Sequence, residues 1–359
     1  MSLSRTARGR GDQAEPRFPL AVTGTARRAS VASSVRRAHY GRLPKGTTGG
    51  PTNRNWIPKR GLGLVLGALV TLLTTASLRA QTPEDGLMMS KRSLCTGFLY
   101  SHDSWSEYWE GTLERGNGNI GRVTTESIQW YGVYGITDRV NVAATVPYVE
   151  TGASAGTLHG MKGFQDLTLA AKFTLLTKSS KSGTFRTFVV GSLGLPLTDY
   201  TPDFLPLSIG LGSRRAAGRL TLNYQAVQGW YFNGSASYTR RGNIHLDREA
   251  YYTDGQLYLT DEVAMPDAFD WVLSAGYVKG RWQAPLSVSQ QITLGGGDIR
   301  RQDMPFPSNR MIATRVEALV MYTIPKAMAV RVAAAYTVDG RNVGKATTLT
   351  AGLLYTVHF

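Results

Sequence analysis

Residues 347–359, the end of the chain, alternate between apolar side chains and polar or small ones almost without exception. The apolar set is Leu349, Ala351, Leu353, Tyr355, Val357 and Phe359, and the other set is Thr348, Thr350, Gly352, Leu354, Thr356 and His358. A period of two places the sets on opposite faces of a β-strand, so each face meets a different environment. The segment predicts the final strand of an all-β fold, either of a membrane-spanning barrel or of a soluble domain.

About twelve alternating segments follow residue 90, and that region shows no convincing amphipathic helix. Most have roughly 9 to 14 residues, the length that a tilted strand needs to cross a bilayer. They span residues 92–101, 121–134, 139–150, 164–177, 184–195, 217–227, 230–241, 268–278, 282–295, 311–323, 327–337 and 346–359.

The connections between these segments alternate in length. Short ones lie at 135–138, 178–181, 228–229, 279–281 and 324–326, and long ones at 102–120, 151–163, 196–216, 242–267, 296–310 and 338–345. Short periplasmic turns and longer extracellular loops are typical of a transmembrane barrel, whereas a soluble multi-hairpin protein has no reason to keep this alternation. The sequence therefore predicts a transmembrane antiparallel β-barrel of about 12 strands, with its last strand closing against residues 92–101.

The alternation also predicts which charged residues face the interior of the barrel. An Arg or Lys side chain at the lipid midplane costs about 2–4 kcal/mol, and this cost favours the inward face. The candidates for the lumen and the solute path are Asp166, Lys172, Arg186, Arg315, Glu317 and Arg331. Asp166 and Lys172 share a face but stand too far apart to pair with each other, so we expect each to have a partner on a neighbouring strand. Either a structural salt-bridge network or the lining of a solute path would explain the whole set.

The first eighty residues differ from the rest. Residues 1–60 hold 13 of the 40 Lys and Arg residues but only 2 of the 25 acids, so the formal net charge of +15 mostly reports this segment and does not indicate a nucleic-acid partner. Residues 1–54 are predicted to be a disordered basic segment or the product of a wrongly assigned start. Residues 55–80 read as a signal peptide cleaved after Ala80, although a single membrane-spanning helix is the alternative. Residues 81–359 are then the barrel.

Little in the sequence points to catalysis, a cofactor or a metal. The single cysteine, Cys95, excludes an internal disulfide and a cysteine-based metal cluster. A barrel hydrolase needs a histidine near a nucleophile and an acid at the rim. His102, His159 and His245 are the candidates on the extracellular side, but none stands in a recognisable motif. We therefore expect no enzyme activity and no cofactor.

Two segments carry a resemblance to a known family. Residues 131–148 contain Tyr-Gly-Val-Tyr-Gly-Ile-Thr-Asp-Arg and then Val-Pro-Tyr, and residues 163–173 read Gly-Phe-Gln-Asp-Leu-Thr-Leu-Ala-Ala-Lys-Phe. Together they resemble the outer-membrane family named for the meta-pathway of phenol degradation, over about residues 120–359, and the Gly-rich residues 210–213 resemble a further element of that family. Gly135 and Asp138 also suit a tight turn in which Asp138 bonds its own backbone.

The resemblance implies an outer-membrane channel or transporter that passes small hydrophobic or aromatic solutes by passive diffusion. A structural or adhesive barrel without transport is the alternative, and a barrel hydrolase is a further one. The expected location is the outer membrane of a Gram-negative-type bacterium, and the expected partners are outer-membrane lipid, the solute and the barrel-assembly machinery. Phe359 and Tyr355 resemble the C-terminal signal that this machinery reads in outer-membrane barrels.

Overall fold

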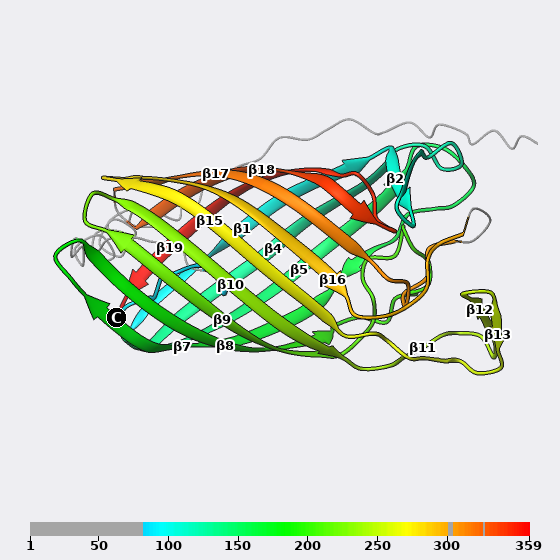
Figure 1. The fold of residues 1–359 in the computed structure, drawn as a ribbon, viewed down its shortest axis with the longest axis horizontal. Helices are drawn as coiled ribbons and strands as arrows, with labels where there is room; N and C mark the ends of the chain where they lie inside the picture. The colour runs from blue at the N-terminus through cyan, green and yellow to red at the C-terminus, as the bar shows by residue number, and fades with distance from the viewer. Residues whose placement is uncertain (1–81, 301–303, 326) are drawn as a thin grey trace, which may run out of the picture. The chain divides into compact units, whose positions relative to one another are not determined.

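The computed structural model describes residues 82–300, 304–325 and 327–359, which build a closed antiparallel barrel (Figure 1). Its twelve long strands are β1 (Ser93–Trp105), β4 (Val123–Thr137), β5 (Val140–Ala153), β7 (Asp166–Ser179), β8 (Gly183–Pro196), β9 (Arg215–Ala226), β10 (Trp230–Arg241), β15 (Ala268–Lys279), β16 (Trp282–Thr293), β17 (Ile312–Ile324), β18 (Met328–Arg341) and β19 (Thr347–His358). The predicted strand number and the predicted fold class are confirmed.

The barrel closes where its first strand pairs with its last. β1 and β19 are antiparallel from the pair Ser93 and His358 to the pair Ser104 and Thr347. β1 also pairs with β4 on its other side, and each later long strand pairs with the next, so the long strands leave no open edge. Ser93 Oγ and His358 Nδ1 lie 2.7 Å apart and add a side-chain hydrogen bond to this closure. Closure satisfies backbone groups that lipid could not hydrogen-bond.

Short turns and long loops lie at opposite ends of the barrel, as predicted (Figure 1). Two predicted loops contain more structure than the sequence indicated. β1 continues to Trp105, and a hairpin of β2 (Glu107–Glu110) and β3 (Leu113–Gly116) follows it. The loop over 242–267 holds two small sheets, made by β11 (Ile244–His245) with β14 (Glu262–Val263) and by β12 (Tyr251–Thr253) with β13 (Gln256–Tyr258). The three-residue strand β6 (Lys162–Phe164) pairs with β5.

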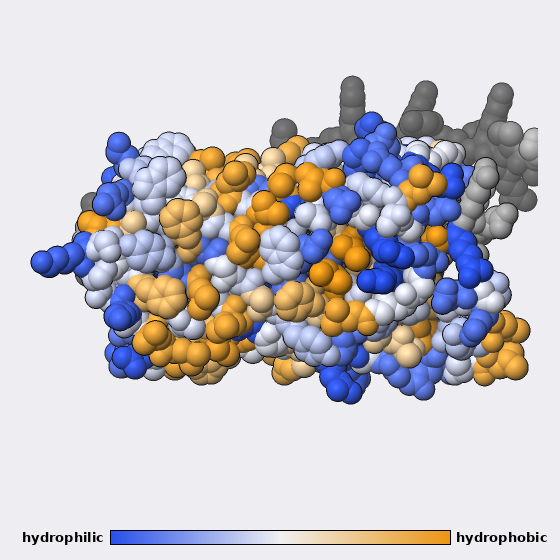
Figure 2. Space-filling model, in the orientation of Figure 1, coloured by the Kyte–Doolittle hydropathy of each residue, from blue (hydrophilic) through white to orange (hydrophobic). Residues whose placement is uncertain are grey.

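The outer face of the wall is apolar along the strands. On β19, Leu349 and Leu353 are 54% and 49% exposed, whereas Leu354 on the inner face is 3% exposed. Other strands repeat the pattern with exposed Phe98, Ile128, Val142, Leu169, Phe173, Leu193, Leu220, Leu222, Phe232, Leu273, Leu286, Val320, Val330 and Val332. Figure 2 shows such side chains in orange along the visible wall. A soluble protein does not expose an apolar surface of this extent, so the wall is built to contact lipid.

Aromatic pairs mark both ends of this apolar wall. At the end with the short turns, Trp230 packs against Tyr277 with ring centroids 4.8 Å apart, and Trp282 packs against Tyr322 at 4.6 Å. At the loop end, Tyr148 meets Phe164 edge to face at 5.4 Å. Aromatic rings favour the boundary between lipid tails and water, and two such belts are typical of outer-membrane barrels.

The predictions for residues 1–54 and 55–80 lie outside the described residues and stay predictions. None of the residues that the structure describes forms a helix long and apolar enough to cross a membrane.

Candidate functional site

The inner face of the barrel is polar at many positions where the outer face is apolar. On β9, Thr221 and Asn223 are buried while the alternating Leu220 and Leu222 are exposed. The same alternation places Asp166 and Lys172 of β7 inside, each 3% exposed. Because period-two patterning separates the two faces, the candidate site of this protein is the lumen and whatever fills it.

One long loop enters the loop end of the lumen. The loop covers residues 197–214, between β8 and β9, and its Leu207 and Ile209 are 0% and 3% exposed. Thr151, an inward-facing residue of β5, donates a hydrogen bond from Oγ1 to the Leu207 carbonyl at 2.6 Å. A cavity of about 360 Å³ remains between the loop and inward-facing residues of β4 and β5, including Thr125 and Gln129. The loop thus narrows the mouth of the barrel.

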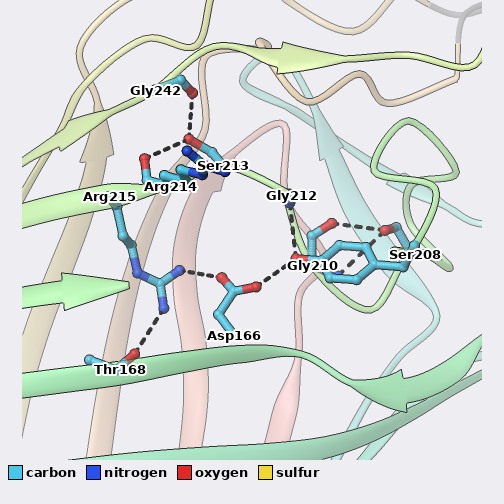
Figure 3. A network of polar contacts seen from close by, with 10 residues as sticks. Asp166, Thr168, Ser208, Gly210, Gly212, Ser213, Arg214, Arg215 and Gly242 are labelled. Atoms are coloured by element: carbon cyan, nitrogen blue, oxygen red, sulfur yellow. Dashed lines mark hydrogen bonds and ion pairs between the residues drawn. The ribbon is translucent and has the colours of Figure 1, made fainter. Parts of the chain in front are cut away.

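Asp166 anchors this loop through a network of partly buried polar contacts (Figure 3). Its Oδ2 accepts a hydrogen bond from Arg215 Nη1 at 2.8 Å, and its Oδ1 accepts one from the Tyr200 hydroxyl at 2.7 Å. Arg215 Nη2 also donates to Thr168 Oγ1 at 3.2 Å, and the Gly212 amide donates to the Tyr200 oxygen at 3.0 Å. Burial raises the pKa of the Tyr200 hydroxyl, and the bond to Asp166 raises it further, so the phenol stays protonated and remains a donor.

A second segment occupies the lumen from the other direction. We call residues Thr82–Met89, which precede β1, the strap. Lys172 Nζ donates to the Thr82 carbonyl at 3.0 Å, to the Asp85 carbonyl at 2.7 Å and to Asp85 Oδ1 at 3.0 Å. The Asp85 carboxylate also accepts the Leu87 amide at 2.9 Å. These bonds fix the strap to the inner wall at β7.

The strap also fits closely against β9 and against the turn end of the lumen. An added Cβ on Gly86 would lie 2.3 Å from the side chain of Asn223, so only glycine allows this approach to β9. Further along, Met89 packs in a buried cluster with Cys95, Tyr131, Val133, Met321, Ala329 and Leu354 from the inner faces of five strands. The Lys91 amide donates to Asp138 Oδ1 at 3.0 Å, so Asp138 joins the turn 135–138 to the residues that precede β1, and its bond to its own turn stays a prediction.

Between the strap and the far wall lies a cavity of about 430 Å³, which we call the strap cavity. Arg315, Glu317 and Arg331 line it from β17 and β18, and Glu84 and Asp85 line it from the strap. The rest of the lining is mixed, with apolar side chains such as Leu319 and Met321 and polar ones such as Asn233, Ser274 and Gln283. The Arg331 Nε–H is buried and has no hydrogen-bond partner among the described residues. A buried donor without a partner carries a desolvation cost.

The six predicted lumen residues lie in different parts of the lumen. Asp166 holds the loop, Lys172 holds the strap, and Arg315, Glu317 and Arg331 line the strap cavity. Arg186 lies opposite the inward-facing Asn223 in the register of β8 and β9. The expectation that Lys172 pairs with a neighbouring strand is wrong, because its partners come from a segment 87 to 90 residues earlier in the chain.

The two residues of the predicted assembly signal lie on the outer face. Tyr355 and Phe359 are 45% and 73% exposed at the turn end of β19, and the Phe359 amide donates to the Arg92 carbonyl at 2.9 Å. Their role as an assembly signal stays a prediction.

Several residues of the lumen were missed by sequence reasoning. Arg219 of β9 bonds Asp270 of β15 at 2.6 Å and Ser235 at 3.0 Å, across the inner wall. The alternation in 217–227 could have placed Arg219 inside, because it shares a face with Thr221. No sequence pattern marks Asp85 or Tyr200, because both lie in segments without periodicity.

The histidines do not form a hydrolytic site within the described residues. His102 Nδ1 lies 3.4 Å from Glu126, and His245 Nδ1 lies 3.0 Å from Asp261, in each case without a recorded bond to a serine. His358 does bond Ser93, but Ser93 is 0% exposed and the second ring nitrogen of His358 has no recorded partner. A triad needs an accessible nucleophile and an orienting acid, and this pair has neither.

Comparison with known proteins identifies the family. A family profile described as "Putative MetA-pathway of phenol degradation" matches residues 117–352, which is most of the barrel. The chain belongs to this family. The match confirms the resemblance that the segments 131–148 and 163–173 carry.

One solved structure supports the fold, and two others are more distantly similar. An outer-membrane channel from Pseudomonas putida F1 superposes with a TM-score of 0.63 at 13% identity, covering 77% of this chain and 100% of that one. The NanC porin gives a TM-score of 0.40 at 9% identity over 72% of this chain and 98% of its own. The TodX monoaromatic hydrocarbon channel gives 0.37 at 10% identity over 76% and 91%. No curated protein matches the sequence. The protein is an outer-membrane β-barrel of the Gram-negative type, with a porin or channel fold of a class that is typically not enzymatic.

Proposed function

We propose that this protein is a passive outer-membrane channel for small hydrophobic or aromatic solutes. The observation that carries the proposal is the pair of cavities inside the lumen, about 360 Å³ beneath the loop 197–214 and about 430 Å³ beside the strap. Each is lined by apolar and polar side chains together, and each is within the size range of small-molecule sites. The family description and the hydrocarbon-channel title of one structural relative support the same solute class.

The lumen favours small solutes over large ones. The loop and the strap both cross it, so a molecule much larger than a single aromatic ring would have to displace one of them. Transport would be diffusion down a gradient, without catalysis or a cofactor. The chain's partners are then the lipid around the apolar wall, the solute, and the assembly machinery that would read Phe359 and Tyr355.

Flux measurements test this function. The purified protein in proteoliposomes should accelerate entry of phenol relative to empty vesicles and to vesicles with a closed eight-stranded barrel. In planar bilayers it should give small, discrete conductance steps. Absence of both conductance and solute flux would refute the channel.

One observation favours a second candidate, a structural barrel without transport. The strap fills the turn end of the lumen with a buried apolar cluster around Met89. If the strap never leaves, the barrel is closed, and the same flux assay gives the background rate.

A further inference from the structure

The cavity beneath the loop 197–214, which we call the loop cavity, is lined by uncharged side chains. It is bounded by β4 and β5 of the inner wall and by loop residues 205 and 208–211. None of the described residues that line it carries an ionisable side chain, whereas five charged residues line the strap cavity. Burying a charge without a partner is costly, so the loop cavity favours an uncharged ligand.

A row of polar side chains on β4 faces the loop cavity. Thr125, Ser127 and Gln129 occupy alternate positions of this strand, so all three side chains point into the lumen. None of them forms a side-chain hydrogen bond with another of the described residues. The intervening Glu126 lies on the outer face, where it pairs with His102 at 3.4 Å. The row therefore offers hydroxyl and amide groups that can donate and accept, without a charge.

Apolar side chains from β5 and from the loop adjoin this polar row. They belong to Pro147, Val149, Leu205, Ile209 and Leu211. Val149 stands directly across from Ser127 in the register of β4 and β5, so the row borders an apolar surface. Ser208 also reaches the cavity, but its hydroxyl donates to the Gly210 carbonyl at 2.8 Å (Figure 3). The hydrogen-bonding groups that remain for a ligand thus lie chiefly on β4.

We propose that the loop cavity binds uncharged aromatic compounds that carry a hydroxyl group, with the hydroxyl bonded to Thr125, Ser127 or Gln129 and the ring against the loop and β5. The proposal rests on the proposed channel function and narrows its solute class to rings with one polar, uncharged group. A volume of about 360 Å³ accommodates a single ring. A ring without such a group would displace water from the polar row without replacing its hydrogen bonds, and an ion would find no opposite charge.

Four probes that share a ring test the site. Calorimetry on the detergent-solubilised protein, with matching titrations into detergent alone, measures the affinity of each. Benzyl alcohol should bind most tightly, and toluene, benzoate and benzylammonium about tenfold more weakly, the loss expected from one or two hydrogen bonds. Thr125→Val/Ser127→Ala/Gln129→Leu removes the polar row. It should weaken benzyl alcohol binding about tenfold, to the level of toluene, and should keep the heat-dependent gel mobility of the folded barrel.

Two controls locate the ligand. Thr124→Val removes a hydroxyl from the outer face of the same strand and should leave the affinity for benzyl alcohol unchanged. In Ser127→Cys, benzyl alcohol should slow the reaction of the new thiol with a water-soluble thiol reagent. In Ser180→Cys, at the turn between β7 and β8, the same compound should have no effect.

Equal affinity for benzyl alcohol and toluene, or unchanged binding of benzyl alcohol by Thr125→Val/Ser127→Ala/Gln129→Leu, overturns the proposal. If phenol still crosses the membrane in that case, the channel function stands and only the loop-cavity site fails. If benzyl alcohol protects Ser127→Cys but neither phenol flux nor conductance is seen, the protein binds the compound without transporting it, and the channel function fails.

Discussion

Replacing Lys172 with methionine is the most direct way to release the strap. The substitution keeps most of the side-chain volume but removes an ammonium group whose side chain is 4% exposed and which donates to Thr82 and twice to Asp85. The Asp85 carboxylate, 19% exposed, then loses its cation. Removing one member of a buried ion pair costs about 3–5 kcal/mol.

If the strap leaves the wall, Asp85 becomes solvated and the free-energy cost is avoided. The substitution therefore shifts the equilibrium between docked and released strap toward release. A loss of about 3 kcal/mol changes that equilibrium by roughly a hundredfold, because each 1.4 kcal/mol corresponds to a factor of ten. We therefore expect Lys172→Met to convert a docked strap into one that is released for a measurable fraction of the time. The barrel itself should persist, because its twelve-strand ladder does not depend on Lys172.

Two assays report strap release. In planar bilayers, Lys172→Met should show longer or larger open states than the unchanged protein. In a Glu84→Cys background, a water-soluble thiol reagent should label the strap faster when Lys172 is replaced. Cys95 is buried at 1% exposure and provides the slow internal reference.

A double variant supplies the control for this reasoning. Lys172→Met/Asp85→Leu removes both charges and leaves no unpaired buried ion, so it should restore much of the docking that Lys172→Met loses. If Lys172→Met matches the unchanged protein in both conductance and labelling, the ion pair does not hold the strap and the argument is refuted.

Three further predictions concern other parts of the barrel. Tyr200→Phe removes one of the donors to Asp166 and should cost about 1–3 kcal/mol of loop docking, seen as faster proteolysis within 197–214; cleavage at the original rate would contradict the anchoring role. Deleting Phe359 should lower the amount of folded barrel in the outer membrane, measured by heat-dependent gel mobility, and undiminished assembly would exclude it as a signal. Asp298 lies in the loop between β16 and β17, and hydrogen bonds from Arg341 hold its pKa below the ordinary value of 3.8. The contact therefore stabilises the loop fully above about pH 4, and this stabilisation is lost as the pH falls through the lowered pKa. The rate at which an acid-active protease cleaves this loop should therefore rise in the unchanged protein as the pH is lowered below about 4. In Asp298→Asn, the cleavage rate should vary with pH only as the activity of the protease itself does.

Local sequence was sufficient to predict the wall. The alternation of Leu349 to Phe359 and its repeats gave the strands to within about four residues, because period two and strand length are local properties that a bilayer enforces. The largest errors at the wall were the ends of β1 and β18, which run to Trp105 and Arg341 where residues 101 and 337 were expected. At the end of β1, Asp103 read as part of a loop because it is polar, but it faces the lumen and continues the strand.

The sequence by itself determined the class of fold, the two faces of each strand and the inward placement of charges such as Lys172 and Arg331. These follow from the cost of putting a charge in lipid, which acts on one residue at a time. Only the tertiary structure decided what those inward charges do. The strap and the loop 197–214 have no periodicity, and their partners lie far away in the chain, as Asp85 and Lys172 do. Barrel closure brings such segments into one lumen, where polar bonds and apolar packing to the inner wall hold them.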